Sequence, residues 1–137
     1  MKKNLKKNNI TYAVGRRKES SARIRLFEGH GENLVNGKKE SEYFQGAVLS
    51  KLLAKPFDVT ESGGKYYYTA KVVGGGKNGQ LDALVLGIAR ALAKVSPDKF
   101  KFLLRKPGLL TRDSRARLRR MVGTGGKARR MKQSPKR

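Results

Sequence analysis

Residues 66–95 read YYYTAKVVGGGKNGQLDALVLGIARALAKV, and they contain a strand, a glycine loop and a helix in direct succession. Lys65 to Val73 is rich in β-branched and aromatic residues, which predicts the strand. Gln80 to Val95 predicts the clearest amphipathic helix of the chain, because its apolar residues recur at helical spacing. The stripe that this helix would bury comprises Leu81, Leu84, Val85, Ile88, Leu92 and Val95.

Four other segments predict strands, because they are rich in strand-forming residues and are bounded by turn residues. They are Thr11 to Val14, residues 22–26, Asn33 to Gly37 and Phe57 to Thr60. In the second of these, Ala22, Ile24 and Leu26 alternate with Arg23 and Arg25, which predicts a half-buried strand with a cationic outer face. The last would form a hairpin with the strand that begins the quoted stretch.

Two further helices are predicted beside the long one. Ser41 is expected to cap a helix that runs to about Ala54, and Pro56 to end it. Ser96-Pro97 fits an N-cap followed by proline at the first helical position, and begins another helix that runs to about Arg105. This order of elements predicts an α+β domain of two layers, with the helices packed on one face of a mixed sheet.

Charge divides the chain more sharply than hydrophobicity does. The 137 residues include 33 Lys or Arg and 10 Asp or Glu, for a net charge of +23. Most of this excess lies near the two ends, whereas residues 19–104 are nearly balanced. We therefore expect a basic N-terminal arm over 1–9, a globular α+β domain over 10–106 and an extended basic tail over 107–137. A surface this cationic repels itself unless an anionic partner neutralises it.

The composition excludes several classes of function. No Cys is present and His30 is the only histidine, which excludes disulfides, thiolate metal sites and a histidine-based catalytic triad. No apolar run approaches the ~18 residues of a membrane span, and none follows the basic start as a secretory signal requires. The acids are scattered, without a pair suited to acid/base catalysis. We expect no enzyme activity, no cofactor, no metal and no membrane partner.

The loop from Gly74 to Gly79 is the first candidate site. It matches the G-x-G-x-x-G dinucleotide fingerprint, but the acid expected about 20 residues on is Asp98, at a helix start and not at the end of a second strand. A flexible turn is one alternative. The other is a phosphate site, in which Lys77 and the backbone N–H groups at the helix N-terminus hold an RNA phosphate, and glycine lets the backbone approach closely.

Two other features suit nucleic acid and also have plain structural explanations. Arg16, Arg17 and Lys18 follow a bend, where three adjacent cations form either a solvated surface or a phosphate contact. In the run Tyr66-Tyr67-Tyr68, the middle residue lies on the opposite face of the strand from its neighbours. One face would belong to the core, and the other would be plain surface or a platform for stacked bases.

The C-terminal stretch is the most unusual feature of the sequence. Eleven basic residues lie between Arg112 and Arg137, and glycines at positions 123, 125 and 126 interrupt any helix. Such a segment cannot bury enough apolar surface to fold alone. Three alternatives are open: a disordered nonspecific tail, a membrane-surface or calmodulin-type helix, or an extension that penetrates RNA, in which arginines bridge phosphates and glycines permit tight paths.

Several motifs occur in order along nearly the whole chain, from Thr11 to Arg137. They are YAVGRRKESSAR at 12–23, GGGKNGQ at 74–80, GIARAL at 87–92, LLTRD at 109–113, KARR at 127–130 and the final Lys136-Arg137. Together they resemble the small-subunit ribosomal protein nine family. The resemblance implies the ribosomal S-five second-domain type of fold, with a mixed four-stranded sheet, helices on one face and a left-handed βαβ crossover.

The same resemblance implies a structural role in translation. The protein would bind small-subunit rRNA in the head of the subunit, beside neighbouring head proteins, and its tail would reach the peptidyl site. The contact with tRNA there would fall to Lys136 and Arg137. The arginine-rich ending and the lack of a visible transit peptide favour a cytoplasmic, bacterial-type ribosome. The expected rRNA-binding residues are Arg16, Arg17, Lys18, Gly75, Gly76, Lys77, Arg105, Lys106, Arg112, Arg115, Arg117, Arg119, Arg120, Lys127, Arg129 and Arg130.

Two other functions remain open at this point. The basic composition also fits a free nucleic-acid-binding module, histone-like or chaperone-like, that acts on DNA or mixed RNA. The glycine loop leaves a nucleotide-dependent enzyme as a third reading, which would show saturable dinucleotide binding.

Overall fold

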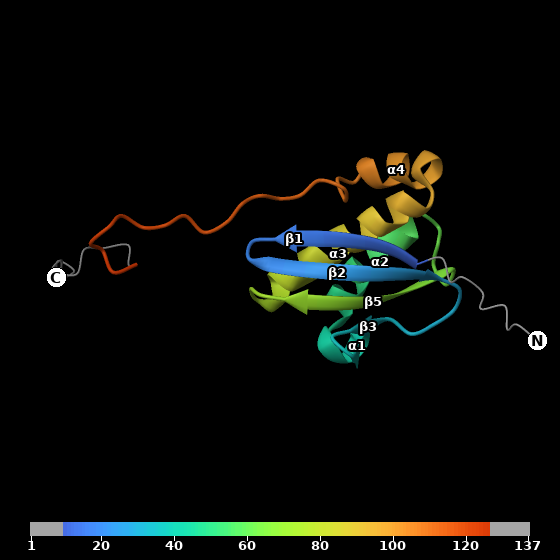
Figure 1. Cartoon of the computed structure of the whole chain (residues 1–137), viewed down its shortest axis with the longest axis horizontal. Coiled ribbons are helices and arrows are strands. Elements are labelled where there is room, and N and C mark those ends of the chain that lie inside the picture. The colour runs from blue at the N-terminus through green and yellow to red at the C-terminus, as the bar shows by residue number, and fades with distance from the viewer. Residues whose placement is uncertain (1–9, 127–137) are drawn as a thin grey trace, which may run out of the picture.

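The strands form one layer of the molecule and the long helices lie behind it (Figure 1). The structure is a computed structural model that describes residues 10–126. The strands are β1 (Ile10–Arg17), β2 (Ser20–Glu28), β3 (Leu34–Val35), β4 (Lys38–Lys39) and β5 (Tyr66–Val73), in the sheet order β1-β2-β5-β3-β4. The helices are α1 (Glu40–Tyr43), α2 (Ala47–Val59), α3 (Lys77–Val95) and α4 (Pro97–Arg105).

The sheet is mixed, as the sequence predicts. The strands β1, β2 and β5 are antiparallel neighbours, and β3 pairs parallel with β5. The resemblance implies four strands, and the sheet has a fifth, the short β4, which pairs antiparallel with β3. It arises because Asn36 and Gly37, the two residues between these strands, have φ values of 51° and 80°, the geometry of a two-residue hairpin turn.

The parallel strands β3 and β5 are joined through α1 and α2, which makes a βαβ unit. In Figure 1 the arrow of β5 points left, β5 lies above β3, and the connecting helix α2 lies behind the sheet. A chain that advances in this way turns in the left-handed sense, opposite to nearly all such crossovers. The left-handed crossover that the resemblance implies is therefore present.

Alternate strand residues and one side of α3 form the core, as the sequence predicts. Ile24 and Leu26 of β2 and Leu84 of α3 are at most 1% exposed. The backbones of β1 and α3 lie very close together where Gly15 faces Gly87. A Cβ at Gly15 would lie 2.6 Å from the Gly87 nitrogen and would overlap the Ala83 carbonyl oxygen. Glycine at this position is therefore required by space.

Residues 40–60 differ from the prediction. Two helices replace the single one expected over 41–54, and Pro56 lies inside α2 instead of ending a helix. The helix continues through the proline because Leu53, Pro56 and Phe57 are buried against the core, and packing outweighs the local propensity. The hairpin predicted from Phe57 is wrong for the same reason, since Phe57 is helical and its ring stacks on Tyr68 with centroids 6.3 Å apart.

The last two helices lie close to their predicted positions. α3 begins at Lys77, three residues earlier than predicted, so the loop before it narrows to Gly74–Gly76. α4 has proline in its first turn as predicted, but Ser96 makes no side-chain capping hydrogen bond. After α4 the chain stays on the body for a few residues, because the Leu109 N–H donates to the Leu104 carbonyl at 3.1 Å and Leu109 and Leu110 pack against the core.

Candidate nucleic-acid interface

Two of the predicted cationic features meet at one end of the sheet. The β1–β2 turn lies against the glycine loop, because Ser20 Oγ donates to the Gly74 carbonyl at 3.1 Å and a Cβ at Gly74 would lie 2.6 Å from the Glu19 carbonyl oxygen. Lys18 in this turn has φ 51° and is exposed, and Lys77 beyond the loop is exposed as well. The structure therefore brings two exposed cations, Lys18 and Lys77, to the same glycine loop.

The glycine loop has a fixed shape that leaves one side open. Gly74 and Gly75 have φ values of 77° and 62°, and the Gly74 carbonyl accepts hydrogen bonds from Ser20 Oγ and from Gln80 Nε2, each at 3.1 Å. A Cβ at Gly75 would overlap Ser20 Oγ, whereas one at Gly76 would meet nothing within 4 Å. The loop is thus held from behind by the protein and is accessible at Gly76.

The loop ends at the N-terminus of the 19-residue helix α3. Gly76 is the N-cap and has no side chain, so the first N–H groups of α3 have neither an intrahelical acceptor nor a side-chain cap. Such N–H groups suit a phosphate oxygen. The dinucleotide alternative lacks its context, because α3 leads into α4 and not into a second parallel strand.

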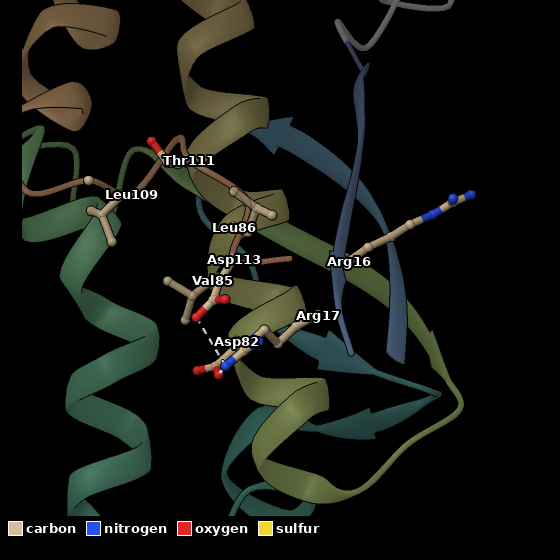
Figure 2. Close-up of a pocket in the computed structure, with 9 residues that line it drawn as sticks. Arg16, Arg17, Asp82, Val85, Leu86, Leu109, Thr111 and Asp113 are labelled. Atoms are coloured by element: carbon tan, nitrogen blue, oxygen red, sulfur yellow. Dashed lines mark hydrogen bonds and ion pairs between the residues drawn. The ribbon is translucent and has the colours of Figure 1, made fainter. Parts of the chain in front are cut away.

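Arg17 is directed into the protein and not outward with its neighbour Arg16. Figure 2 shows its side chain near Asp82 of α3 and Asp113 of the chain beyond α4. Arg17 Nε lies 3.4 Å from Asp82 Oδ2, one terminal nitrogen lies 3.0 Å from Asp113 Oδ2, and the other donates to the Arg115 carbonyl at 2.7 Å. The Arg17 side chain is only 13% exposed. We call this group of Arg17, Asp82, Asp113 and Arg115 the tail clamp.

Asp113 is held as a carboxylate within the tail clamp. Hydrogen bonds from the Arg115 side chain and backbone, at 2.7 to 3.1 Å, lower the pKa of Asp113 well below its ordinary value, and the nearby charge of Arg17 acts in the same direction. The same pairing raises the pKa of Arg115. Asp113 therefore keeps its negative charge to a lower pH than an ordinary aspartate does, and its contacts hold the first residues of the tail on the body.

Beyond the tail clamp the chain runs away from the body as an extended segment (Figure 1). Its arginines are exposed, and so are three apolar side chains, Leu118, Met121 and Val122, at 74–88%. We call residues 112–120, which include the end of the tail clamp, the arginine segment; its exposed arginines are Arg112, Arg115, Arg117, Arg119 and Arg120. Arg105 and Lys106, at the end of α4, are exposed too. Lys127, Arg129, Arg130, Lys136 and Arg137 lie outside the described residues.

The tyrosine run lies mainly in the protein interior. Tyr68 is fully buried, its hydroxyl donates to Glu40 Oε2 at 2.8 Å, and burial together with this carboxylate raises its pKa. Tyr67 points to the other face, as predicted, and stacks on Phe27 with centroids 5.0 Å apart. Tyr66 is half-buried and packs against the core. These contacts favour the structural explanation of the run.

The described part of the chain offers little for other chemistries. Within residues 10–126, no group of three or more acidic or histidine side chains is arranged to hold a metal ion. Over the same residues, no helix combines the length and apolar character that crossing a membrane requires.

Sequence reasoning missed the two carboxylates of the tail clamp. Asp82 and Asp113 are the partners of Arg17, and neither stood out as a site residue. One signal was present: Asp113 is the only acid between residues 105 and 137. A single carboxylate within a strongly cationic segment indicates a specific partner. The assignment of rRNA contacts to the exposed cations stays a prediction.

The family model and the curated relatives that match this chain point to the same protein family. Residues 15–137 match the family model described as ribosomal protein S9/S16. The chain is 44% identical over 126 residues to the small ribosomal subunit protein uS9 of Thermus thermophilus, covering 92% of this chain and 97% of that protein. It is 42% identical over 125 residues to the protein of the same name from Cutibacterium acnes, covering 91% of this chain and 72% of that protein.

Proposed function

Because the chain belongs to the ribosomal protein S9/S16 family, we propose that it is a structural protein of the small ribosomal subunit that binds small-subunit rRNA and serves translation. The family consists of structural ribosomal proteins and not of enzymes. The proposal places the chain in the head of the subunit, in contact with neighbouring head proteins, in a cytoplasmic ribosome.

The observation that carries the rRNA-binding proposal is the arginine segment, residues 112–120. Its five arginines between 112 and 120 are exposed, and within the described residues only Arg115 of these five forms an ion pair. Extended chain with exposed apolar residues and uncompensated charge does not stabilise itself in water. RNA phosphates would neutralise the arginines, and the surrounding RNA would cover the apolar side chains.

The glycine loop adds a second predicted contact. The exposed side of Gly76, the free N–H groups of α3 and the side chain of Lys77 surround one position where a phosphate oxygen would fit. Lys18 is exposed in the adjacent turn. This arrangement supports a phosphate contact on the globular body, in addition to those of the arginine segment.

The contact with peptidyl-site tRNA is the finer part of the proposal. It rests on the family resemblance of the chain end and on the charge of Lys136 and Arg137, which lie outside the described residues. Phosphates position a protein without reading sequence, so such a contact would not depend on tRNA identity.

Sedimentation tests the main proposal. The full chain, tagged and expressed in bacterial cells, should co-sediment with small subunits in a sucrose gradient after a high-salt wash. A chain that dissociates in salt and redistributes equally onto added DNA would contradict the proposal and would favour the free nucleic-acid-binding module. A saturable heat of NAD or ATP binding in calorimetry would instead favour the nucleotide-dependent enzyme.

A further inference from the structure

The face of the sheet that is turned away from the helices is exposed and strongly cationic. The long helices α2 and α3 lie behind the sheet in Figure 1, and no described helix or strand lies in front of β1, β2 and β5. We call it the open face. Alternate residues of β1, β2 and β5 supply its exposed side chains, which are Ile10, Tyr12, Val14, Arg16, Arg23, Arg25, Lys71 and Val73.

Strand register places like charges next to one another on the open face. Arg23 of β2 lies directly opposite Lys71 of β5, and Arg25 lies two residues along β2 on the same side. Like charges directly opposite across a sheet destabilise it. A sheet that only needed a solvated outer surface would not require this arrangement. The juxtaposition therefore indicates an anionic partner.

The protein itself does not neutralise these charges. Among the described residues, Arg16, Arg23, Arg25 and Lys71 form no ion pair, since the ion pairs of that part of the chain involve Arg17, Lys39 and Arg115. The three long strands contain one acid, Glu28, and the alternation of β2 puts it on the helix side with Leu26. The charges that β1, β2 and β5 place on the open face are consequently all positive.

An aromatic ring and a shallow hollow accompany the charges. The Tyr12 side chain is 57% exposed, and the Arg25 guanidinium lies 5.9 Å from its ring centroid. Tyr12, Arg23, Arg25 and Lys71 all line a hollow of about 790 Å³ over the strands. Aromatic rings and arginines on an open sheet are the means by which several RNA-binding folds stack unpaired bases.

We propose that the open face binds an unpaired stretch of RNA, with Arg23, Arg25 and Lys71 on its phosphates and the Tyr12 ring against a base. Arg23 and Arg25 are about 6.7 Å apart along the strand, which is comparable with successive phosphates of an extended RNA strand. This proposal rests on the proposed rRNA-binding function but adds a surface separate from the arginine segment and the glycine loop.

Salt dependence tests the phosphate contacts. The full-length double variant Arg23→Gln/Lys71→Gln is compared with Lys51→Gln/Lys55→Gln, which removes two exposed cations from α2. The probe is a single-stranded RNA 12-mer of mixed sequence. Two lost phosphate contacts should reduce the slope of log affinity against log salt by about 1.4 for the open-face variant. The α2 variant should keep the wild-type slope.

Fluorescence tests the base contact directly, because the chain contains no tryptophan. Tyr12→Trp places a single indole reporter on the open face, and Val48→Trp places one at a site on α2 that is 71% exposed. Single-stranded RNA should quench the reporter at position 12 strongly and the one at position 48 weakly, while a duplex of the same length should quench neither strongly. Both variants should melt at the wild-type temperature.

The outcomes separate this proposal from the proposed function. In the first outcome, the wild-type chain binds RNA and joins small subunits, but both double variants show the same decrease in the slope of log affinity against log salt, and RNA quenches both tryptophans equally. The open-face proposal is then wrong and the proposed function stands. If RNA affinity is unchanged while the open-face variant no longer joins subunits, the face binds an acidic protein and the RNA proposal is overturned. If wild type itself binds neither, the proposed function fails.

Discussion

Arg17 and Asp113 form an ion pair of 3.0 Å although 96 positions separate them in the sequence. The pair joins the end of the first strand to the first residues beyond the last helix. Arg17 also donates to the Arg115 carbonyl at 2.7 Å. A single guanidinium therefore binds both the Asp113 carboxylate and the backbone of the chain where it leaves the body. The direction in which the tail leaves the body is therefore set by the folded protein before any RNA is present.

Removing the charge of Asp113 should loosen the start of the tail. In Asp113→Asn, Arg17 keeps its contacts with Asp82 and with the Arg115 carbonyl, but its ion pair with residue 113 is lost. The ion pair between Arg115 and residue 113 is lost as well. Trypsin should therefore cut after Arg115 and Arg117 several times faster, with the melting temperature nearly unchanged because Arg17 keeps its other two partners. Asp98→Asn, at an exposed acid of α4, is the control and should leave cleavage unaltered.

The pH dependence of the tail clamp has a definite sign. Hydrogen bonds from Arg115 lower the pKa of Asp113, so its contribution is fully present above the ordinary Asp value of about 3.9. The contribution is lost only as pH falls through the lower pKa of the folded state. A carbon-13 NMR titration of the Asp113 carboxyl should show a midpoint below the ordinary Asp value of about 3.9. A midpoint at that ordinary value would mean that the clamp does not persist in solution.

The contact between β1 and α3 should tolerate no added methyl group. Gly15→Ala would place a Cβ on the Ala83 carbonyl oxygen and 2.6 Å from the Gly87 nitrogen, and both are backbone atoms that cannot move aside. We expect a loss of about 3 kcal/mol or more in the free energy of unfolding, at the upper end for overpacked cores. Urea denaturation measures it. Gly63→Ala, whose Cβ would meet nothing within 4 Å, should stay near wild type.

The two adjacent glycines of the loop should respond differently to valine. At Gly76 the φ is −104° and space is open, so Gly76→Val should keep the melting temperature while it blocks the approach of a phosphate and weakens assembly into subunits. At Gly75 the φ is 62° and the new Cβ would overlap Ser20 Oγ, so Gly75→Val should lower the melting temperature itself. Normal assembly of Gly76→Val would remove the case for a phosphate at this loop.

Deleting residues 112–137 should separate folding from RNA affinity. The cut spares Leu109 and Leu110, which pack against the core, and it removes 11 of the 33 basic residues. The shortened chain should show a wild-type circular dichroism spectrum and a cooperative melt, with a much shallower slope of log affinity for RNA against log salt. An unchanged slope would assign RNA affinity to the body, and an unfolded product would make the tail part of the core.

Removing only Lys136 and Arg137 should act on tRNA and not on assembly. The remaining basic residues of the tail would still hold rRNA, so subunits containing this variant should form in normal yield. Peptidyl-site tRNA should bind them more weakly, by about 1–3 kcal/mol, the scale of hydrogen bonds to charged groups. Filter binding with several tRNAs measures the change. Affinity equal to that of intact subunits for every tRNA would exclude a role for these two residues.

Hydrophobic periodicity correctly predicted those helices and strands in which the apolar residues of the pattern are also the residues that the fold buries. The stripe of α3 and the alternation of β2 were sufficient because local pattern and tertiary burial point the same way. Pro56 is a position where prediction from local pattern fails. Proline usually ends a helix, but Pro56 lies inside α2 because it and the neighbouring Phe57 are buried. The crossover hand could not follow from pattern at all, since general experience predicts the opposite hand.

The candidate site was predicted in part. The glycine pattern located the loop and charge located the arginine segment, since both are visible in the sequence. The different roles of Arg16 and Arg17 could not be predicted, because they depend on strand alternation and on an acid that is remote in sequence. The sequence predicted the cationic face of β2. That Arg23 on this face lies opposite Lys71 could be learned only from the register in which β2 pairs with β5.

The close approach of Gly15 to Gly87 also constrains the order of events during synthesis. These residues are 72 positions apart, so at ~5–20 residues per second the ribosome extends the chain for about 4 to 14 s after Gly15 before Gly87 is added. During that interval the β1–β2 hairpin has no helix over its apolar side, and an isolated hairpin is barely stable in water. Arginines on its other side oppose pairing with like strands of neighbouring nascent chains.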